Sequence, residues 1–366
     1  MESYYTIQLQ PYKLQFKFEA GTSRGVLREK TTFFLLIKNK KGDLVGIGEA
    51  GPLPKLSIDD TLDFYTDALC LLNQIIISDD LLSERSIYDF VSKHIPNQFP
   101  SLKFALETAL LDMKNGGRRI IFNNSFSKGD KELLINGLIW MGEPDFMLNQ
   151  IDEKIQEGYR CLKLKIGALD FEKECAILEK IRNRFDKTQI ELRVDANGAF
   201  TIKEALSKLE RLSKFQIHSI EQPIKAGQHH QMARLCKESP LDIALDEELI
   251  GVFGFSKKRA FLEGILPQYI VLKPTLLGGF KETDEWISLA DSLGIQWWIT
   301  SALESNVGLN AIGQYVATLN PKLPQGLGTG KLYDNNLTSP LSLRGEYLSY
   351  KLKGNEWDLS AIEKVL

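Results

Sequence analysis

Two lysines, Lys163 and Lys165, alternate with apolar residues in the segment Cys161-Leu162-Lys163-Leu164-Lys165-Ile166. Strict alternation predicts a short β-strand with one apolar face and one face that carries both ammonium groups. Because each ammonium disfavours the charged form of the other, the pKa of at least one lysine should fall, and a lysine that is neutral at physiological pH can act as a base. The competing interpretation is a solvated edge strand whose lysines discourage aggregation.

Four further charged residues follow Lys165 at nearly regular intervals along the chain. They are Asp195, Glu221, Asp246 and Lys273, and the successive intervals are 30, 26, 25 and 27 residues. Each interval matches about one strand plus one helix, so each residue falls at the C-terminal end of a successive predicted strand. A single Asp at such a place is usually a turn former or a helix cap. Five charged residues in phase favour a common site, because the strand ends of a barrel meet at one mouth.

The chemistry of this set follows from its residue types. Its three carboxylates come without histidine or cysteine, which predicts a hard oxygen site for Mg²⁺, with Mn²⁺ as a possible substitute. The lysines precede and follow the carboxylates in strand order, so we expect Lys165 and Lys273 on opposite sides of the mouth. A divalent cation between two lysines suits removal of a proton next to a carboxylate, since the cation stabilises the enediolate and a lysine moves the proton.

The elements that must position these residues are strands and helices that alternate from residue 133 onward. Amphipathic patterns predict helices over 171–185 and over 201–215, the second with Thr201 and Glu204 as a capping box. The candidate strands are 134–141, 161–166, 190–195, 218–221, 243–246, 269–273, 297–301 and 326–328. Eight strands alternating with helices predict an α/β fold of the (β/α)8 type, a modified TIM-like barrel, and a doubly wound open sheet is the competing architecture.

The first 130 residues follow a different pattern, which is typical of an antiparallel sheet followed by helices. The expected elements are an alternating strand around 14–18, a hairpin that joins 31–37 to 44–49, and helices that begin at Ser57 (with Asp60 as its capping-box partner), cover 82–94 and cover 101–115. We therefore expect an α+β module at 1–130 and a barrel domain at 131–320. The segment 321–366 should supply the last barrel strand and a C-terminal return to the first module.

Length and composition limit the class of protein. The chain has 366 residues, 43% of them hydrophobic and 25% charged, which is ordinary for a globular enzyme. The net charge of -3 and the absence of long basic runs predict no nucleic-acid partner. No apolar stretch is long enough to span a membrane, the first residues do not resemble a signal peptide, and the four cysteines have no pairing or zinc-type spacing. We expect a cytoplasmic enzyme that acts on a small-molecule carboxylate, and its oligomeric state is left open.

Four motifs resemble those of the enolase superfamily, muconate-lactonizing subgroup: Lys163-Leu164-Lys165, Val194-Asp195-Ala196-Asn197-Gly198, Ile220-Glu221-Gln222-Pro223 and Leu245-Asp246-Glu247. The resemblance covers essentially the whole chain and implies that the first module is a capping domain. It implies a role for each charged residue of the set: Mg²⁺ ligands at Asp195, Glu221 and Asp246, acid/base lysines at 165 and 273, and a neighbour, Lys163, that lowers the pKa of Lys165. It also implies that loops around Arg24 and 48–52 close over a substrate, and it makes Asn197 a candidate substrate contact.

Two later stretches bear on the substrate. Residues 300–308, Thr-Ser-Ala-Leu-Glu-Ser-Asn-Val-Gly, and 326–333, Gly-Leu-Gly-Thr-Gly-Lys-Leu-Tyr, resemble the seventh and eighth strand regions of the o-succinylbenzoate synthases in this subgroup. Dipeptide epimerases of the subgroup hold a substrate ammonium with paired carboxylates at the eighth strand, where this chain has none. An uncharged, glycine-rich mouth favours a dianionic substrate, because backbone N–H groups can approach its carboxylates.

This second resemblance implies a lyase that carries out the Mg²⁺-dependent dehydration that forms 2-succinylbenzoate in menaquinone biosynthesis. Ser301 and Gly328 become candidate substrate contacts, although both also suit turns at strand ends. Two alternatives stay open. One is a dipeptide epimerase or N-acylamino acid racemase that uses both lysines as bases, and the other is a catalytically silent barrel.

Overall fold

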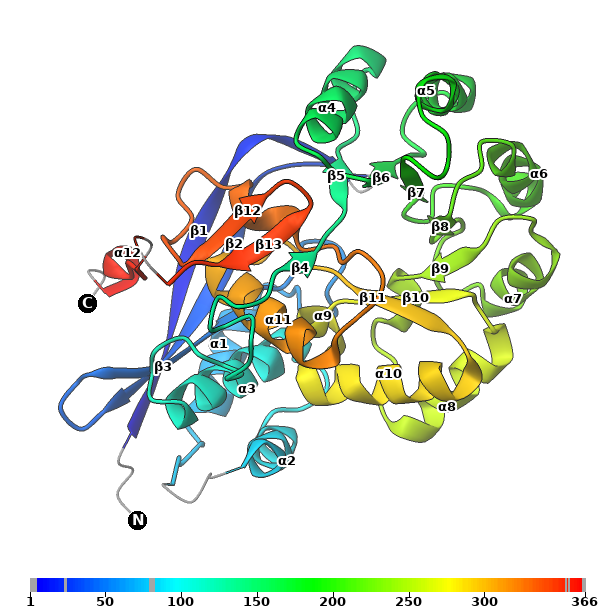
Figure 1. Cartoon of the computed structure of the whole chain (residues 1–366). Helices are drawn as coiled ribbons and strands as arrows, with labels where there is room; N and C mark the ends of the chain where they lie inside the picture. Colours follow the sequence, from blue (N-terminus) through cyan, green and yellow to red (C-terminus); the bar gives the residue numbers. More distant parts are fainter. Residues whose placement is uncertain (1–4, 23–24, 79–82, 353, 355, 364–366) are drawn as a thin grey trace.

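The structure of the chain is a computed structural model that describes residues 5–22, 25–78, 83–352, 354 and 356–363. Figure 1 shows two parts: antiparallel strands with three helices beside them, and a ring of short strands with helices around its outside. None of the helices in the described ranges combines the length and the apolar composition that a membrane crossing requires.

The N-terminal part is built on a three-stranded antiparallel sheet with the order β1-β2-β3. Its strands are Tyr5–Thr22, Gly25–Asn39 and Leu44–Ala50. The predicted strand around 14–18 is confirmed, with Leu14 and Phe16 buried. The predicted hairpin is also confirmed, and its turn is closed by Asn39, whose Oδ1 accepts the backbone N–H groups of Lys41 and Asp43 at 2.9 and 3.0 Å.

Three helices follow this sheet: α1 (Phe64–Leu72), α2 (Glu84–His94) and α3 (Pro100–Lys114). Nearly every residue of α3 is buried, since the helix packs against β3 and also against the barrel. Gly48 permits this close approach, because a Cβ there would collide with the carbonyl oxygen of Ala105 in α3. Strand β3 includes residues 46–50. The prediction of a loop over 48–52 is therefore wrong for residues 48–50.

The helix predicted to begin at Ser57 begins at Phe64 instead. The expected capping residues form a turn: Oγ of Ser57 accepts the N–H of Leu53 at 2.7 Å, and Oδ2 of Asp60 accepts the N–H of Lys55 at 2.7 Å. Short polar side chains bind nearby backbone groups in turns as readily as at helix N-termini, and this explains the error.

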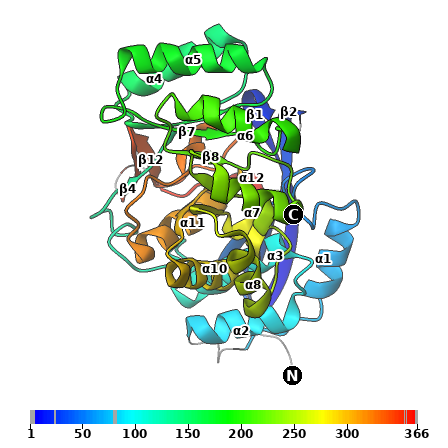
Figure 2. The same ribbon diagram turned by 90° about the vertical axis from the view of Figure 1, so that its right-hand side faces the viewer.

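The second part contains a seven-stranded parallel sheet in sequential order from β5 to β11. Its strands are β5 (Gly137–Ile139), β6 (Cys161–Lys165), β7 (Glu191–Asp195), β8 (Ser219–Glu221), β9 (Ile243–Leu245), β10 (Tyr269–Leu272) and β11 (Gln296–Ile299). The helices on its outside are α4 (Pro144–Gln156), α5 (Phe171–Arg184), α6 (Ile202–Ser213), α7 (His229–Glu238), α8 (Phe255–Ile265), α10 (Phe280–Leu293) and α11 (Asn306–Leu319). Figure 2 shows these helices from the side opposite the N-terminal sheet.

Two residues replace the predicted eighth strand. Gln325 bridges Ile135 and Gly326 bridges Thr300, both in parallel, so they close the ring between β11 and the start of the barrel. Gly326 fits here because a Cβ would collide with the side chain of Thr300. The chain then turns into a short 3-10 helix, η2 (Gly328–Lys331), and 326–328 is not a strand.

The predicted first barrel strand, 134–141, is divided between two sheets. β4 (Leu133–Leu134) pairs with β13 (Tyr347–Tyr350), which also pairs with β12 (Leu341–Arg344), and only β5 joins the barrel. Beyond that hairpin the last helix, α12 (Ser360–Glu363), lies beside the N-terminal sheet (Figure 1), where Ile362 packs with Phe34.

Glu49 of β3 joins the two parts of the molecule. Its Oε1 accepts the hydroxyl of Thr32 at 2.7 Å and the N–H of Ser305 at 2.8 Å. Its Oε2 accepts the hydroxyl of Ser305 at 2.5 Å and the N–H of Gly308 at 2.9 Å. Ser305 is the N-cap of α11, so a carboxylate of the N-terminal sheet caps a helix of the barrel.

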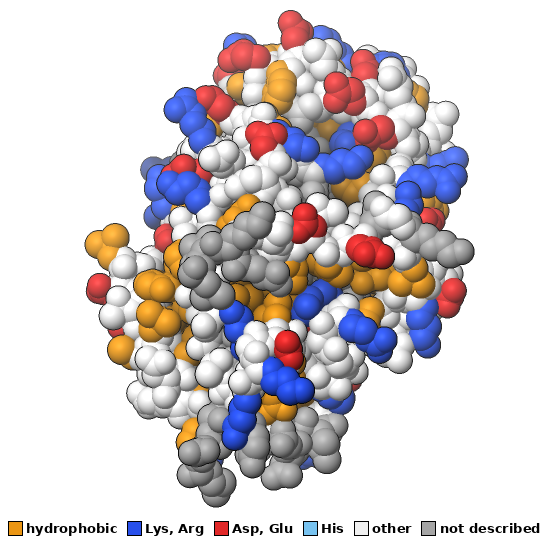
Figure 3. Space-filling view, turned by 90° about the vertical axis from the view of Figure 1, so that its left-hand side faces the viewer, with side chains coloured by type: hydrophobic (Ala, Val, Ile, Leu, Met, Phe, Trp, Pro, Cys, Tyr) orange, Lys and Arg blue, Asp and Glu red, His pale blue; other side chains and the backbone are white. Residues whose placement is uncertain are grey.

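Figure 3 shows the face that contains the N-terminal sheet. Basic and acidic side chains are interspersed over the described part of this face, and hydrophobic side chains gather in a band near its middle. The described surface on this side therefore has a mixed charge, in keeping with the small net charge of the chain.

Candidate active site

Strand register brings the charged residues of the sequence pattern together. Lys165 pairs in register with Asp195, and Asp195 with Glu221, across β6, β7 and β8. Asp246 directly follows β9 and Lys273 directly follows β10, the next two strands of the same sheet. All five therefore lie at the C-terminal ends of consecutive parallel strands, at one end of the barrel.

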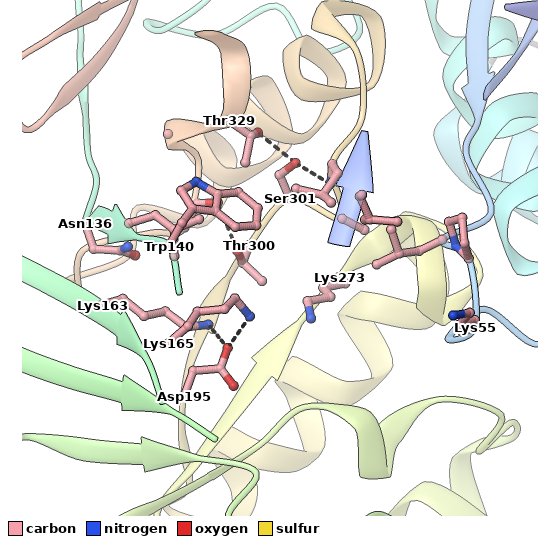
Figure 4. A pocket seen from close by; sticks show the side chains of 18 of the residues that line it. Lys55, Asn136, Trp140, Lys163, Lys165, Asp195, Lys273, Thr300, Ser301 and Thr329 are labelled. Atoms are coloured by element: carbon pink, nitrogen blue, oxygen red, sulfur yellow. Dashed lines mark hydrogen bonds and ion pairs between the residues drawn. The ribbon is translucent and has the colours of Figure 1, made fainter. Parts of the chain in front are cut away.

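Lysines and carboxylates alternate within this group. Nζ of Lys163 lies between Asp195, at 3.1 Å, and Glu221, to which it donates a short hydrogen bond. Nζ of Lys165 donates to Oδ2 of Asp195 and to Oδ1 of Asn197, each at 2.9 Å. On the other side Lys273 forms an ion pair with Asp246. Figure 4 shows the three lysines around Asp195 and the space above them.

The pKa of Lys163 moves against the prediction for a pair of adjacent lysines. Burial alone would lower the pKa of Lys163, but the carboxylates of Asp195, Glu221 and Asp246 outweigh burial and raise it above the ordinary lysine value. The same balance raises the pKa of Lys273. Burial would raise the pKa of Asp195, yet Lys163 and Lys165 hold it below the usual range. At Lys163 the attraction of the three carboxylates therefore outweighs the repulsion that was expected between the two lysines.

The three carboxylates fit a divalent cation in chemistry and charge. All three side chains are buried, and Oε1 of Glu221 is a buried oxygen without a hydrogen-bond partner in the described chain. A cationic group, the Lys163 ammonium, already lies between Asp195 and Glu221. Within the described ranges no three acidic, histidine or cysteine side chains are arranged closely enough to hold a metal ion as they stand. The donor set, which is made of carboxylate oxygens alone, is the kind that Mg²⁺ prefers.

A pocket lies above the lysines, between the barrel and the N-terminal part. Its barrel wall includes Lys163, Lys165, Asp195 and Lys273, and its other wall comes from residues 25–27 and 53–55. Glu221 and Asp246 are buried beneath it and do not belong to its lining. The pocket therefore exposes amine groups to a ligand while most of the acidic groups lie behind them.

The predicted substrate contacts have different positions in the structure. Ser301 and Gly328 line the pocket. Asn197 does not line the described pocket; its amide accepts from Lys165 and donates to Glu247 at 3.0 Å. Arg24 lies outside the described residues.

Several residues that line the pocket are not among the site residues that the sequence predicts. Trp140 follows β5 directly, so the strand-end rule that identifies the lysines applies to it as well; its backbone is held by two hydrogen bonds with the Gln150 side chain, at 3.0 and 3.1 Å. Asn136 precedes β5 and Thr300 follows β11. Lys55 reaches the pocket from the turn at 53–60, within which the sequence pattern predicts a helix start at Ser57.

Comparison with known proteins shows the family to which the chain is related. Residues 147–351 match the family model described as enolase C-terminal domain-like. The chain is 49% identical over 356 residues to an o-succinylbenzoate synthase from Desulfotalea psychrophila, and the match covers 92% of this chain and 96% of that protein. This chain belongs to the enolase superfamily, in the o-succinylbenzoate synthase family.

Solved structures of enolase superfamily enzymes share the fold. The crystal structure of MenC from Desulfotalea psychrophila superposes with a TM-score of 0.85 at 44% identity, covering 95% of this chain and all of that one. A muconate lactonizing enzyme from Pseudomonas fluorescens, at 20% identity, has a TM-score of 0.80 with coverage of 99% and 98%. Among sequences, an N-succinylamino acid racemase from Thermus thermophilus is 29% identical, covering 85% of this chain and 82% of that protein. The predicted barrel with an N-terminal α+β capping domain is thus confirmed as the fold of the muconate-lactonizing subgroup.

Proposed function

We propose that this enolase superfamily enzyme is an o-succinylbenzoate synthase, a lyase that converts 2-succinyl-6-hydroxy-2,4-cyclohexadiene-1-carboxylate into 2-succinylbenzoate for menaquinone biosynthesis. The charge of the pocket carries the proposal: its charged lining residues are four lysines and one aspartate. A cationic pocket suits a dianion and disfavours the ammonium group of a dipeptide. The high identity to an o-succinylbenzoate synthase supports the same assignment.

In this proposal Asp195, Glu221 and Asp246 hold Mg²⁺. The support is their burial at adjacent strand ends and the unpartnered Oε1 of Glu221. A related dipeptide epimerase from Enterococcus faecalis, at 21% identity, has been solved in complex with Mg. When bound, the ion supplies positive charge next to the substrate carboxylate while negative charge develops there.

Lys165 is the group that moves the proton in this proposal. It lines the pocket, and its Nζ is fixed by Asp195 and Asn197. Lys165 removes the hydrogen from the ring carbon that bears the carboxylate, so a C–H bond breaks and its electron pair enters the ring. It then returns that proton to the leaving hydroxyl group on the same face, the C–O bond breaks, and water departs from an aromatic product.

The other two lysines have electrostatic roles. Lys273 faces the pocket from β10 and places its cation near the anion that forms after proton removal. Lys163 bridges Asp195 and Glu221, so it fixes the positions of the carboxylates and of its neighbour Lys165. The free cysteines of the chain fit the reducing cytoplasm, which we propose as its location.

The test offers the purified enzyme the cyclohexadiene substrate with Mg²⁺ and follows the absorbance of the aromatic product. We expect rapid dehydration and little turnover of a panel of dipeptides. Fast epimerisation of dipeptides without dehydration would overturn the assignment.

A second activity is favoured by one observation. Lys165 and Lys273 line the same pocket from strands that are separated by three others, which is the arrangement that a two-base racemisation needs. The Thermus relative is named as an N-succinylamino acid racemase. Incubation of both enantiomers of an N-succinylamino acid in D₂O tests this activity, since a racemase incorporates deuterium at the α-carbon from either side.

A further inference from the structure

Leu303 has an unusual backbone conformation in the wall of the pocket. Its φ of 64° lies in the left-handed region, which a bulky residue such as leucine rarely adopts. Leu303 lines the pocket together with residues 300–302, and Figure 4 shows Thr300 and Ser301 of this segment beside the space above the barrel lysines. Such a conformation persists only where the surrounding contacts hold it in place, and it is common at functional sites.

Two buried donors hold the carbonyl oxygen of Leu303. Nζ of Lys30, in β2 of the N-terminal part, donates to this oxygen at 3.0 Å. The hydroxyl of Tyr333, which comes shortly after η2, donates to the same oxygen at 2.7 Å. The side chains of Lys30 and Tyr333 are both buried, so the two hydrogen bonds are shielded from solvent. The left-handed backbone of Leu303 is thus held by one residue from the start of the chain and one from its end.

The surroundings of Lys30 suit an ammonium group that reaches Leu303. Burial lowers the pKa of Lys30, and the carboxylates of Glu49 and Glu304 act in the opposite direction. Gly51 leaves space for the ammonium, because a Cβ at that position would lie 2.6 Å from Nζ of Lys30. A buried cation needs both opposite charge and hydrogen-bond acceptors, and the Leu303 carbonyl is such an acceptor.

Leu303 also connects the two walls of the pocket. Its side chain belongs to the same buried apolar cluster as Leu53, and Leu27 packs against this cluster. Residues 25–27 and 53–55 form the pocket wall that comes from the N-terminal part. A displacement of Leu303 would therefore change how that wall packs against the barrel.

We propose that Lys30 is a positioning residue for substrate binding, because its hydrogen bond to the Leu303 carbonyl holds the pocket wall in the shape that the substrate fits. This inference rests on the proposed function for the choice of substrate. Lys30 does not line the described pocket, and the ion pairs of the three barrel lysines are made without it. Loss of the Lys30 ammonium should therefore weaken binding and leave proton transfer nearly unchanged.

The test uses Lys30→Met, which keeps most of the side-chain length and removes the donor. KM for the cyclohexadiene, and the Kd of the product 2-succinylbenzoate in titration calorimetry, should each rise about tenfold, the effect of one lost hydrogen bond from a charged group. The value of kcat should change by less than about twofold, since the proton-transfer lysine is untouched. Tyr333→Phe removes the other donor and should raise KM as well. In the double variant the two effects should not simply multiply, because both donors act on one oxygen.

Lys258→Met is the matched control. Lys258 of α8 is also buried, but it forms ion pairs with Glu282 and Glu285 of α10 and does not line the described pocket. This variant should change Tm and leave KM and Kd as in the wild type. Unchanged KM and Kd in Lys30→Met would overturn the inference, and so would an equal rise in Lys258→Met.

Tyr333→Phe decides the question if Lys30→Met does not fold, since an unchanged KM in that variant would also overturn the inference. Failure of the wild type to dehydrate the cyclohexadiene would instead overturn the proposed function. The N-succinylamino acid assay would then supply the KM for the same comparison of variants.

Discussion

The hydroxyl of Ser301 donates to the carboxylate of Glu304 at 2.5 Å, and both side chains are buried. Oγ of Ser301 also accepts the hydroxyl of Thr329 at 2.9 Å and the N–H of Leu303 at 3.1 Å. Its hydrogen and both of its lone pairs are therefore used within the protein. Direct binding of a substrate by Ser301, which the sequence predicts, requires the exchange of one of these hydrogen bonds.

Glu304 should be important for stability as well as for the pocket. Its carboxylate also accepts the hydroxyl of Thr275 at 2.5 Å and the N–H of Ala302 at 2.8 Å. Glu304→Ala leaves these buried donors without an acceptor and should reduce the free energy of unfolding by about 2–4 kcal/mol. Urea denaturation followed by circular dichroism measures the change. Glu304→Gln keeps an acceptor oxygen and should cost less, so an equal loss in both variants would contradict this role.

Lys165 should be essential for turnover but not for folding. Lys165→Ala removes the proposed acid and base and should lower kcat by about a thousandfold or more, in the range of general acid–base catalysis. Chromatographic quantification of 2-succinylbenzoate in reactions quenched at timed intervals gives the rate. A thermal unfolding curve checks that the variant is folded. Lys208→Ala, a partly buried lysine on α6 away from the pocket, is the matched control and should keep wild-type turnover. Dehydration by Lys165→Ala at near wild-type rates would exclude the proposed role.

Mg²⁺ should stabilise the folded enzyme independently of any substrate. A ligand that binds only the folded chain at a hundred times its Kd adds about 2.7 kcal/mol to the free energy of unfolding. We expect a rise in Tm on Mg²⁺ addition in differential scanning fluorimetry, reversal by EDTA, and loss of the response in Glu221→Gln. An equal response in Glu221→Gln and wild type would place the ion elsewhere.

The buried Glu107 of α3 should make stability fall with rising pH. Burial raises the pKa of Glu107 from 4.5 to about 8, although the N–H of Phe280 donates to its carboxylate at 2.6 Å. Between these two values the folded chain keeps a proton that the unfolded chain releases, so the free energy of unfolding decreases by up to about 1.4 kcal/mol per pH unit. Asp59, whose pKa burial raises to about 6, acts in the same direction at lower pH.

Glu107→Gln separates this contribution from the others. The variant has no proton to release at this position, so its stability should depend less on pH between about 5 and 8 than that of the wild type. Urea unfolding at a series of pH values measures both curves. Parallel curves over the whole range would show that Glu107 does not titrate as described.

The group of charged residues at the strand ends could be predicted from the sequence because these residues recur at nearly regular intervals along the chain. Lys165, Asp195, Glu221, Asp246 and Lys273 each end a strand, and a parallel barrel turns equal spacing along the chain into proximity in space. The family resemblance added the capping domain and the substrate class, which no periodicity carries.

Features that depend on tertiary contacts could not be predicted in this way. The Ser57–Asp60 pair has the same local chemistry in a turn as at a helix start. The turn also contains Asp59, which binds Ser101 of α3, a contact that the local sequence does not reveal. The ring is closed by the two single bridges of Gln325 and Gly326, and the close approach of Gly326 to Thr300 is a property of the assembled ring. The raised pKa of Lys163 likewise requires carboxylates from other strands.

The cap that Glu49 places on α11 has a consequence for the order in which the molecule can form. Glu49 belongs to the third strand, and the backbone groups that it binds, the N–H groups of Ser305 and Gly308, come 256 and 259 residues later. During synthesis from the N-terminus the ribosome has completed most of the barrel before these partners emerge. Until those residues are made, Glu49 has the hydroxyl of Thr32 as its partner within the sheet but not its partners on α11, and the last quarter of translation joins the beginning of the chain to its end.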